Sequence, residues 1–333
     1  MERITTSKNT LKTVSLFSGI GGLDLGFIYN GFDIIWANEL DKFAVQTYKQ
    51  NIDNNIIEGD ILKLYKKVPQ HDVLLAGFPC QPFSMMGKRL GFEDERGTLF
   101  FKIKEIIELN NPKPKIIVLE NVKNLLTHDK GKTFKKMKHI LEDLNYDVYA
   151  EVLDSKDFGI PQTRRRVFVV AFDKNIIKNN IKFEFPKKIN LNINVFDLLD
   201  DEVDKKYFLS NKILPTILAH GSGNYYSKSE IDLEIARPLT ATMHKMHRAN
   251  QDNYYTDMDN RRKFKDTAEK RISNVRKLTP NECRKLQGFP SDWIQVVSDT
   301  QAYRQFGNSV TVDVSYYLSC QIIKYLEVQD YEF

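Results

Sequence analysis

A single cysteine in an unusual position is the first candidate for chemistry. Cys80 lies in Gly77–Ser84 (GFPCQPFS), directly after an apolar run that is typical of a buried strand. A lone cysteine is more often a small buried hydrophobe, but this one stands between two prolines in a turn rather than in an apolar stripe. A cysteine in such a place can act as a nucleophile, provided that positive charge nearby stabilises its thiolate.

Two further segments carry groups that could assist a nucleophile. Glu120–Val122 (ENV) ends the apolar run Ile116–Leu119, where an acid that holds its proton can donate it or a hydrogen bond. A helix-capping acid is the alternative. In Gln162–Arg166 (QTRRR), alternation before a strand would place Arg164 and Arg166 on one face. Such arginines can bind a carboxylate, a phosphate or a base carbonyl, or they line a solvated strand edge.

A glycine-rich turn follows the first apolar run of the chain. Leu16–Gly22 (LFSGIGG) allows a tight turn and the close approach of a ligand to the backbone. Glu39 ends the second run, where a carboxylate can accept hydrogen bonds from ribose hydroxyls, and Asp60, after the third, could bond an adenine edge. An ordinary strand-to-helix turn is the alternative. The glycine spacing departs from the dinucleotide fingerprint, which favours a nucleoside such as S-adenosylmethionine over NAD.

These segments need a scaffold that brings the ends of several strands together. Short apolar runs alternate with helical patterns such as Lys42–Asn51 and Phe100–Leu109. The alternation predicts βαβ units in a doubly wound, Rossmann-like α/β sheet, with ligands bound beyond the carboxyl ends of its strands. The predicted strands include Thr13–Phe17, Ile34–Asn38, Val73–Gly77, Ile116–Leu119, Tyr146–Leu153 and Arg166–Phe172.

The alternation stops near residue 186. From there to about residue 279 the chain is polar and irregular, which predicts a smaller domain, mostly of short strands and loops. Thr311–Val328 has the apolar spacing of one helix, which we expect to return to the first domain. The sequence therefore predicts one domain at 1–186 plus 300–333 that holds the chemistry, and a second, with a hinge, at 187–299.

Composition narrows the class of protein. The 333 residues are 41% hydrophobic and carry a net charge of +5, which excludes disordered and collagen-like chains. No apolar run could cross a bilayer, no secretory signal is visible, and three cysteines favour a reducing compartment over a disulfide scaffold. Basic residues concentrate in 261–277, with eight Lys and Arg against two acids, and in 102–140, with ten Lys against four acids. Such runs are solvated faces or a footprint for a polyanion.

Together, and in this order, the segments resemble the DNA (cytosine-5)-methyltransferases. The matching segments are Phe17–Gly22, Pro79–Gln81, Glu120–Val122, the Gln-x-Arg-x-Arg pattern of Gln162–Arg166, Thr279–Pro290 (TPNECRKLQGFP) and Gln305–Val310 (QFGNSV). The resemblance extends from about Val14 to Val310 without circular permutation. It also implies that 187–299 is the target-recognition domain, since this part of the family varies.

The resemblance implies a mechanism. Cys80 would add to C6 of a cytosine while Glu120 bonds N3. Arg164 would hold the base O2, and Arg166 would help to position the nucleophile. C5 would then take the methyl group of S-adenosylmethionine, which leaves S-adenosylhomocysteine; no metal takes part. A stacked base is out of reach, so the cytosine must be flipped out of the duplex.

The resemblance also assigns the cofactor pocket. The residues implied there are Phe17, Ser18, Gly19, Gly21, Gly22, Glu39, Leu40, Asp60, Ile61, Pro79, Leu99, Asn308, Ser309 and Val310.

DNA contacts are implied in two places. In the family the segment after Cys80 is a mobile loop that closes over DNA, and Arg237–Thr242 resembles the segment that enters the major groove. The expected DNA-contacting residues are Gln81, Ser84, Met86, Lys88, Arg89, Arg237, Thr240, His244, Lys245, His247 and Arg248, with Asn250, Gln251 and Asn253 as further candidates for base edges. His244 and His247 lack a third ligand at metal spacing, so no metal site is expected.

Three alternatives stay open. An RNA cytosine methyltransferase would use the same scaffold, although the Cys-Phe-Thr element of those relatives is absent. A catalytically silent DNA-binding regulator would not need Cys80, Glu120 and Arg164, and a nicotinamide enzyme is disfavoured by the glycine spacing. The favoured interpretation is a bacterial or phage modification enzyme without a long regulatory N-terminal extension. It would be cytoplasmic and monomeric, act on double-stranded DNA, bind no membrane, and be paired in function with a restriction endonuclease without a stable complex.

Overall fold

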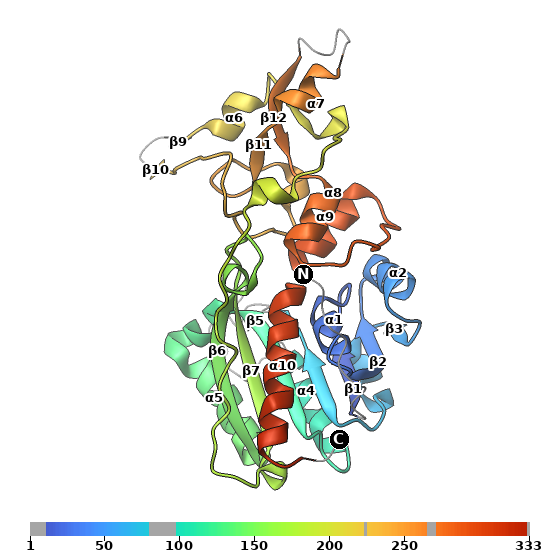
Figure 1. Ribbon diagram of the computed structural model, residues 1–333. Coiled ribbons are helices and arrows are strands. Elements are labelled where there is room, and N and C mark those ends of the chain that lie inside the picture. The colour runs from blue at the N-terminus through green and yellow to red at the C-terminus, as the bar shows by residue number, and fades with distance from the viewer. Residues whose placement is uncertain (1–10, 80–97, 223–224, 265–270, 332–333) are drawn as a thin grey trace, which may run out of the picture. The chain divides into compact units, whose positions relative to one another are not determined.

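The structure is a computed structural model that describes residues 11–79, 98–222, 225–264 and 271–331 (Figure 1). The chain forms two compact units. The first unit comprises residues 1–154, 165–188 and 314–333, and the second comprises residues 155–164 and 189–313. The sequence instead places 155–164 and 300–313 with the first domain, and that division by function stays a prediction.

The first unit contains a seven-stranded sheet with helices on both faces. Its strands are β1 (Lys12–Leu16), β2 (Asp33–Glu39), β3 (Ile56–Glu58), β4 (Val73–Ala76), β5 (Ile116–Val122), β6 (Tyr146–Asp154) and β7 (Arg165–Asp173). Its helices are α1 (Gly22–Ile28), α2 (Lys42–Asn51), α3 (Ile61–Leu64), α4 (Thr98–Leu109), α5 (Lys132–Asp143) and most of α10 (Val312–Val328).

The sheet has the strand order β3-β2-β1-β4-β5-β7-β6, in which β7 is antiparallel to both neighbours and the other pairs are parallel. Val14 and Leu16 of β1 join a core cluster that includes residues of α4 and α5. Ser15, between them, points to the opposite face and contacts Asp24 of α1. Figure 1 shows α10 alongside α1. The predicted doubly wound α/β sheet is confirmed.

Strand β5 is longer than the apolar run that predicts it. It continues through Val122 because β7 pairs with it over its full length, with Glu120 opposite Phe168 and Val122 opposite Arg166. Glu120 is therefore a strand residue, and a helix-capping role is excluded for it. The backbone of Glu120 is therefore held by the pairing of β5 with β7, which fixes the direction of its side chain.

The second unit is mostly loops and short elements, as predicted. Its elements are β8 (Phe208–Ser210), α6 (Leu214–Leu218), β9 (Gly221–Ser222), β10 (Tyr225–Tyr226), β11 (Tyr254–Thr256), α7 (Met258–Arg262), β12 (Ile272–Lys277), α8 (Pro280–Leu286) and α9 (Asp299–Asn308). Strands β11, β12 and β8 form an antiparallel sheet, and β9 and β10 form a hairpin. Across both units, no helix in the described parts of the chain is long and apolar enough to cross a membrane.

Candidate active site

The glycine-rich turn between β1 and α1 has an unusual backbone. Phe17, Gly19 and Gly21 all have positive φ, at 56°, 57° and 83°. A Cβ on Gly21 would come within 3.1 Å of the Tyr48 ring, so both the backbone angle and the packing require glycine there. Ser18 donates its backbone N–H to the Asn38 carbonyl over 3.0 Å, which fixes the turn to the end of β2.

The carboxylate of Glu39 closes this turn. Its Oε2 accepts the backbone N–H of Gly19 over 2.9 Å, and its Oε1 accepts those of Leu40 and Asp41 over 2.8 Å each. An ionised carboxylate can accept about four hydrogen bonds, so capacity remains for a hydroxyl donor. Leu40 is 69% exposed beside it, which offers an apolar contact to a flat ring.

The other predicted cofactor residues of the first unit differ in exposure. Asp60 caps α3 by accepting the N–H of Leu62 over 3.0 Å. Ile61 is buried in the main core cluster, and Leu99 packs at its edge, half-buried. Pro79 is exposed.

Cys80 lies outside the described residues, as do Gln81, Ser84, Met86, Lys88 and Arg89. The segment that leads to Cys80 is nevertheless held closely by β5. Asn121, which is 3% exposed, donates its side-chain amide to the Phe78 carbonyl over 3.0 Å. A Cβ on Gly77 would stand 3.6 Å from Oε2 of Glu120, so this carboxylate lies against the same segment.

Glu120 is oriented by an arginine on the neighbouring strand. Arg166 is opposite Val122, so its side chain falls on the same face as Glu120, one diagonal position away. Its Nε lies 3.1 Å from Oε1 of Glu120, and the carboxylate is nearly buried. One carboxylate oxygen therefore faces the guanidinium, and the other faces Gly77.

Gln162 and Arg164 of the Gln-x-Arg-x-Arg segment serve the second unit. Arg164, 2% exposed, donates from its terminal nitrogens to the carbonyls of Leu239, Gly307 and Ser309 over 2.7–2.9 Å. Gln162 donates to Leu286 O over 2.7 Å and accepts the N–H of Leu239 over 2.9 Å. Strand β7 begins only at Arg165. These contacts give Arg164 a positioning role, and contact with the base O2 stays a prediction.

The last predicted cofactor segment also belongs to the second unit. Asn308 is exposed, whereas Ser309 and Val310 are buried. Gly307 packs so closely on Thr240 and Ala241 that a Cβ there would come within 2.4 Å of their backbone atoms. The segment is therefore joined to the predicted DNA-contacting stretch.

One histidine of that stretch is held rigidly. Oδ2 of Asp252, a 5% exposed residue, accepts the backbone N–H of His247 over 2.8 Å and lies 3.0 Å from its Nδ1. Tyr254 donates its hydroxyl to the His247 carbonyl over 2.6 Å. His247 and Arg248 line a cavity of about 370 Å³. Of the other predicted contacts, Arg237, Thr240 and His244 are half-buried and Lys245 is exposed.

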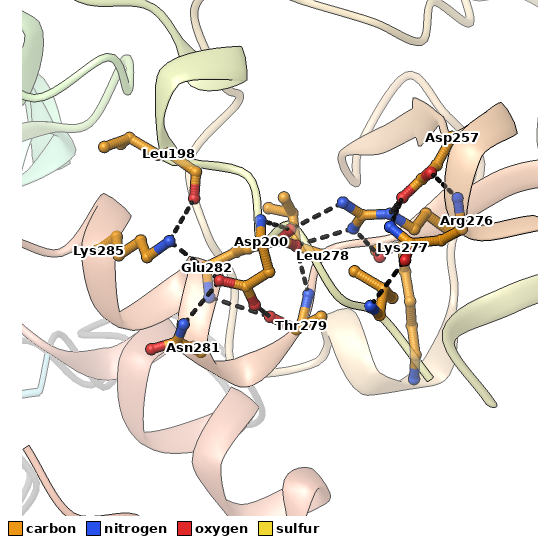
Figure 2. Close-up of polar contacts among 12 residues, drawn as sticks. Leu198, Asp200, Asp257, Arg276, Lys277, Leu278, Thr279, Asn281, Glu282 and Lys285 are labelled. Carbon is orange, nitrogen blue, oxygen red and sulfur yellow. Dashed lines mark hydrogen bonds and ion pairs between the residues drawn. The ribbon is translucent and has the colours of Figure 1, made fainter. Parts of the chain in front are cut away.

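A buried ionic network supports this unit around α8 (Figure 2). Arg276, 1% exposed, donates to both carboxylate oxygens of Glu282 over 2.8–2.9 Å and to Asp257 over 2.7 Å. Glu282 also accepts the N–H groups of Thr279 and Asp200, over 2.7 and 2.8 Å. Arg276 is therefore a structural residue and not a phosphate contact, although it belongs to the basic run 261–277.

The comparisons identify the family that carries this arrangement. A family model described as C-5 cytosine-specific DNA methylase matches residues 11–324. The chain belongs to this family. The methylase is 42% identical over 322 residues to the Type II methyltransferase M1.ScrFI of Lactococcus lactis subsp. cremoris, covering 95% of this chain and 79% of that one. It is 35% identical over 337 residues to the Type II methyltransferase M.HhaI of Haemophilus parahaemolyticus, covering 96% and 97%.

Solved structures agree on the fold of the methylase. The Dnmt2 methyltransferase of S. pombe superposes with a TM-score of 0.75 at 22% identity, covering 95% of this chain and 99% of that chain. The Dnmt2 mutant of Spodoptera frugiperda gives 0.74 at 23% identity, covering 96% and 100%. The predicted fold and enzyme class, a DNA (cytosine-5)-methyltransferase, are both confirmed.

The structure adds site residues that sequence patterns did not single out. Asn121 follows the acid within a matching segment, but its bond to Phe78 has no sequence signal of its own. Gln162 begins another matching segment without an assigned role, yet it is fully buried with both ends of its amide engaged. The sequence signal that could have found them is a polar residue inside or directly before an apolar strand, because a buried polar side chain needs hydrogen-bond partners.

The methylase also contains a cysteine that can be set aside as a rival nucleophile. Cys283 lies in α8 with no exposed surface, and burial raises the pKa of its thiol well above the ordinary value. It therefore stays protonated at neutral pH. This agrees with the prediction that Cys283 serves packing.

Proposed function

We propose that this methylase transfers a methyl group from S-adenosylmethionine to C5 of a cytosine flipped out of duplex DNA, through a covalent bond between Cys80 and C6. The observation that carries the proposal is the placement of Glu120. Its carboxylate is held by Arg166 and lies against Gly77, three residues before Cys80. An acid and a nucleophile that approach the same base must come from neighbouring segments in this way.

The proposed reaction balances through the ring. C5 of cytosine is a poor nucleophile, and addition of the Cys80 thiolate to C6 moves electron density onto C5. Glu120 bonds or protonates N3, which relieves the negative charge that develops on the ring. After C5 has gained the methyl group, a water molecule takes the C5 proton, the bond from C6 to sulfur breaks, the thiolate leaves, and N3 returns its proton to Glu120. Arg164 is proposed to contact O2 and Arg166 to position the acid.

The turn between β1 and α1 suits the proposed cofactor. S-adenosylmethionine supplies an activated methyl group when bound, and S-adenosylhomocysteine is its product. Glu39 retains acceptor capacity for a ribose hydroxyl, and Leu40 presents an exposed apolar side chain next to it. Gly19 leaves open space where a Cβ would stand, so a ligand can approach its backbone. The remaining pocket residues are proposed as assigned from the resemblance.

Flipping of the base follows from access to the ring. C6 lies inside the stack of a duplex, so the Cys80 sulfur cannot reach it without extrusion of the nucleotide. We propose the segment after Cys80 and the stretch 237–248 as the DNA contacts. The rigid His247 supports this assignment, because a held imidazole discriminates better between base edges than a mobile one.

The relatives named Type II methyltransferases support a role as the modification enzyme of a restriction-modification system. We further propose that the enzyme acts as a monomer in the bacterial cytoplasm, and that any cognate endonuclease works without a stable complex.

Bisulfite sequencing of plasmid from an expressing strain tests this function. Protected cytosines within one short sequence are expected, and the site is thereby identified. Purified enzyme is then offered duplex DNA and tRNA in parallel. Methylation of tRNA alone would favour the RNA enzyme, and no transfer to either would favour a silent regulator.

Glu39→Ala is expected to weaken S-adenosylmethionine binding by about 1.5–3 kcal/mol, the range for loss of a hydrogen bond to a charged group. The variant also frees the N–H groups of Gly19, Leu40 and Asp41, which loosens the turn. Calorimetry on the purified protein measures the change. An unchanged affinity would remove Glu39 from the ribose role.

Variants that lose a phosphate contact and variants that lose a base contact are expected to differ in how their DNA affinity depends on salt and on sequence. Arg262, Lys263 and Arg271 are exposed in the basic run. If one of them binds a phosphate, replacing it should lower the slope of log affinity against log salt concentration by about one unit, for all DNA sequences. Replacing a base-contacting residue between 240 and 253 should cost about 1–3 kcal/mol on cognate DNA only.

The measurement is the ratio of cognate to non-cognate affinity at fixed salt, for alanine variants of each group. If variants of the basic run collapse this ratio while variants of 240–253 preserve it, the base contacts have been placed in the wrong segment.

A further inference from the structure

A buried carboxyl group lies beneath the cofactor turn and has no part in the mechanism above. Asp24, in the first turn of α1, has no exposed surface. Its Oδ1 accepts the hydroxyl of Ser15 over 2.7 Å, and its Oδ2 accepts the hydroxyl of Tyr48 over 2.8 Å. Both contacts are neutral, so the carboxylate is held by hydroxyl groups rather than by a cation.

Burying an ionised carboxylate without a cation is unfavourable in free energy. Burial raises the pKa of Asp24 to about 6, even though both hydroxyls favour its ionised form. Tyr48 is the titratable group in contact with it from α2, and burial, followed by the charges of Asp24 and Asp53, raises the pKa of that phenol. An apolar or neutral residue would serve packing alone at lower cost. Packing alone therefore does not explain an acid at this position.

Two contacts connect Asp24 with the cofactor turn. The Ser18 hydroxyl lies 3.0 Å from the Ser15 hydroxyl and 3.1 Å from the Ser15 carbonyl, so it donates to Ser15, while the Ser15 hydroxyl gives its own proton to Asp24. On the other side, the Tyr48 ring packs under Gly21, whose missing side chain leaves the ring its space. The carboxylate thus orients the Ser15 hydroxyl, which leaves the Ser15 oxygen free to accept from Ser18, and it holds the Tyr48 ring in place through the phenol.

We propose that Asp24, with Ser15 and Tyr48, positions the cofactor turn by holding Ser18 and Gly21 in the geometry that receives the nucleoside. The inference rests on the proposed function and deepens it, because it assigns a positioning residue outside the predicted pocket. The ionised carboxylate accepts from both hydroxyls and donates to neither. An amide in its place puts a donor where one oxygen accepted and forces that hydroxyl to turn, and a proton on the carboxyl group adds a donor and weakens the acceptor at one oxygen.

The test is calorimetric binding of S-adenosylhomocysteine to the full-length protein, followed by steady-state kinetics. Asp24→Asn is expected to weaken binding by about tenfold, the equivalent of one hydrogen bond, and to raise KM for S-adenosylmethionine by a similar factor. The KM for DNA and kcat at saturating cofactor should change less than twofold. Tyr48→Phe should give a smaller loss in the same direction.

Ser319→Ala is the matched control. Ser319 is buried in α10, accepts from Asn30 over 2.7 Å and donates to Gly26 over 2.8 Å, so it contacts α1 away from the turn. The Ser319→Ala substitution should lower thermal stability and leave cofactor affinity unchanged. Equal losses of affinity in Ser319→Ala and Asp24→Asn would reduce Asp24 to a stabilising residue and overturn the proposal.

The pH dependence gives a second readout that needs no comparison of stability. The ratio of wild-type affinity to Asp24→Asn affinity should fall as the pH drops through about 6, because Asp24 then takes up a proton. Titration of the groups that both proteins share cancels in this ratio. A ratio that is flat between pH 5 and 7.5 would contradict the inference. If Asp24→Asn does not fold, the same ratio is taken against Asp24→Ser, which also lacks the titrating carboxyl group. Wild-type protein that binds no S-adenosyl nucleoside at any pH would instead refute the proposed cofactor.

Discussion

Cys80→Ala is expected to reduce methylation by roughly 10⁴-fold or more, the scale seen when a covalent nucleophile is removed. The loss follows because no other group can make the bond to C6. Binding of S-adenosylmethionine should survive, since the turn at Gly19 and the carboxylate of Glu39 belong to other segments. Transfer of labelled methyl groups to DNA measures the first quantity, and calorimetry the second.

The other two cysteines provide the controls. Cys283→Ala and Cys320→Ala should both remain active, because Cys283 is fully buried and Cys320, half-buried in α10, contacts Asn30. A Cys80→Ala enzyme that still turns over would remove the nucleophile from the mechanism. A folded Cys283→Ala protein without activity would show that Cys80 is the wrong assignment for the nucleophile.

Arg276→Ala is expected to lower the free energy of unfolding by about 3–5 kcal/mol, because it leaves two carboxylates buried without their partner. Glu282 is 1% exposed, and Asp257, which accepts from the same guanidinium, is nearly buried (Figure 2). This is a large share of the total stability of a typical domain. Denaturant titration, monitored in the second unit by intrinsic fluorescence, measures the change.

Arg262→Ala serves as the comparison from the same basic run. Its guanidinium is 71% exposed and lies 3.8 Å from an exposed Asp259 carboxylate. Such a pair contributes at most about 1 kcal/mol. Equal effects of the two variants would show that the network around α8 does not stabilise the unit.

The sequence predicted the first unit well because its strands are short apolar runs between amphipathic helices. The apolar spacing predicts both ends of α2 (Lys42–Asn51), and for α10 it predicts a start one residue too early. The apolar run predicts strand β5 only as far as Leu119, because Glu120 and Asn121 are polar, whereas the strand continues to Val122. Their place in the strand depends on pairing with β7, which lies far along the chain and leaves no local signal.

The candidate site shows the same limit. The types and order of Cys80, Glu120 and Arg166 could be taken from the sequence, because motif residues carry their chemistry with them. The partners of Arg276 and Arg164 could not, since a basic side chain looks alike in a charge run whether it is exposed or buried. Burial depends on tertiary packing, and it decides whether an arginine meets phosphate or a buried carboxylate.

The most direct test of covalent catalysis uses DNA in which 5-fluorocytosine replaces cytosine, incubated with enzyme and S-adenosylmethionine. Fluorine cannot leave C5 as a cation, so the reaction should stop with the methylated base bound to the protein through sulfur. Denaturing electrophoresis detects the complex, and peptide mass spectrometry locates the bond. We expect a denaturation-stable complex at Cys80 that is absent from Cys80→Ala. Methylation of ordinary DNA without any trapped complex, or a bond at another residue, would contradict it.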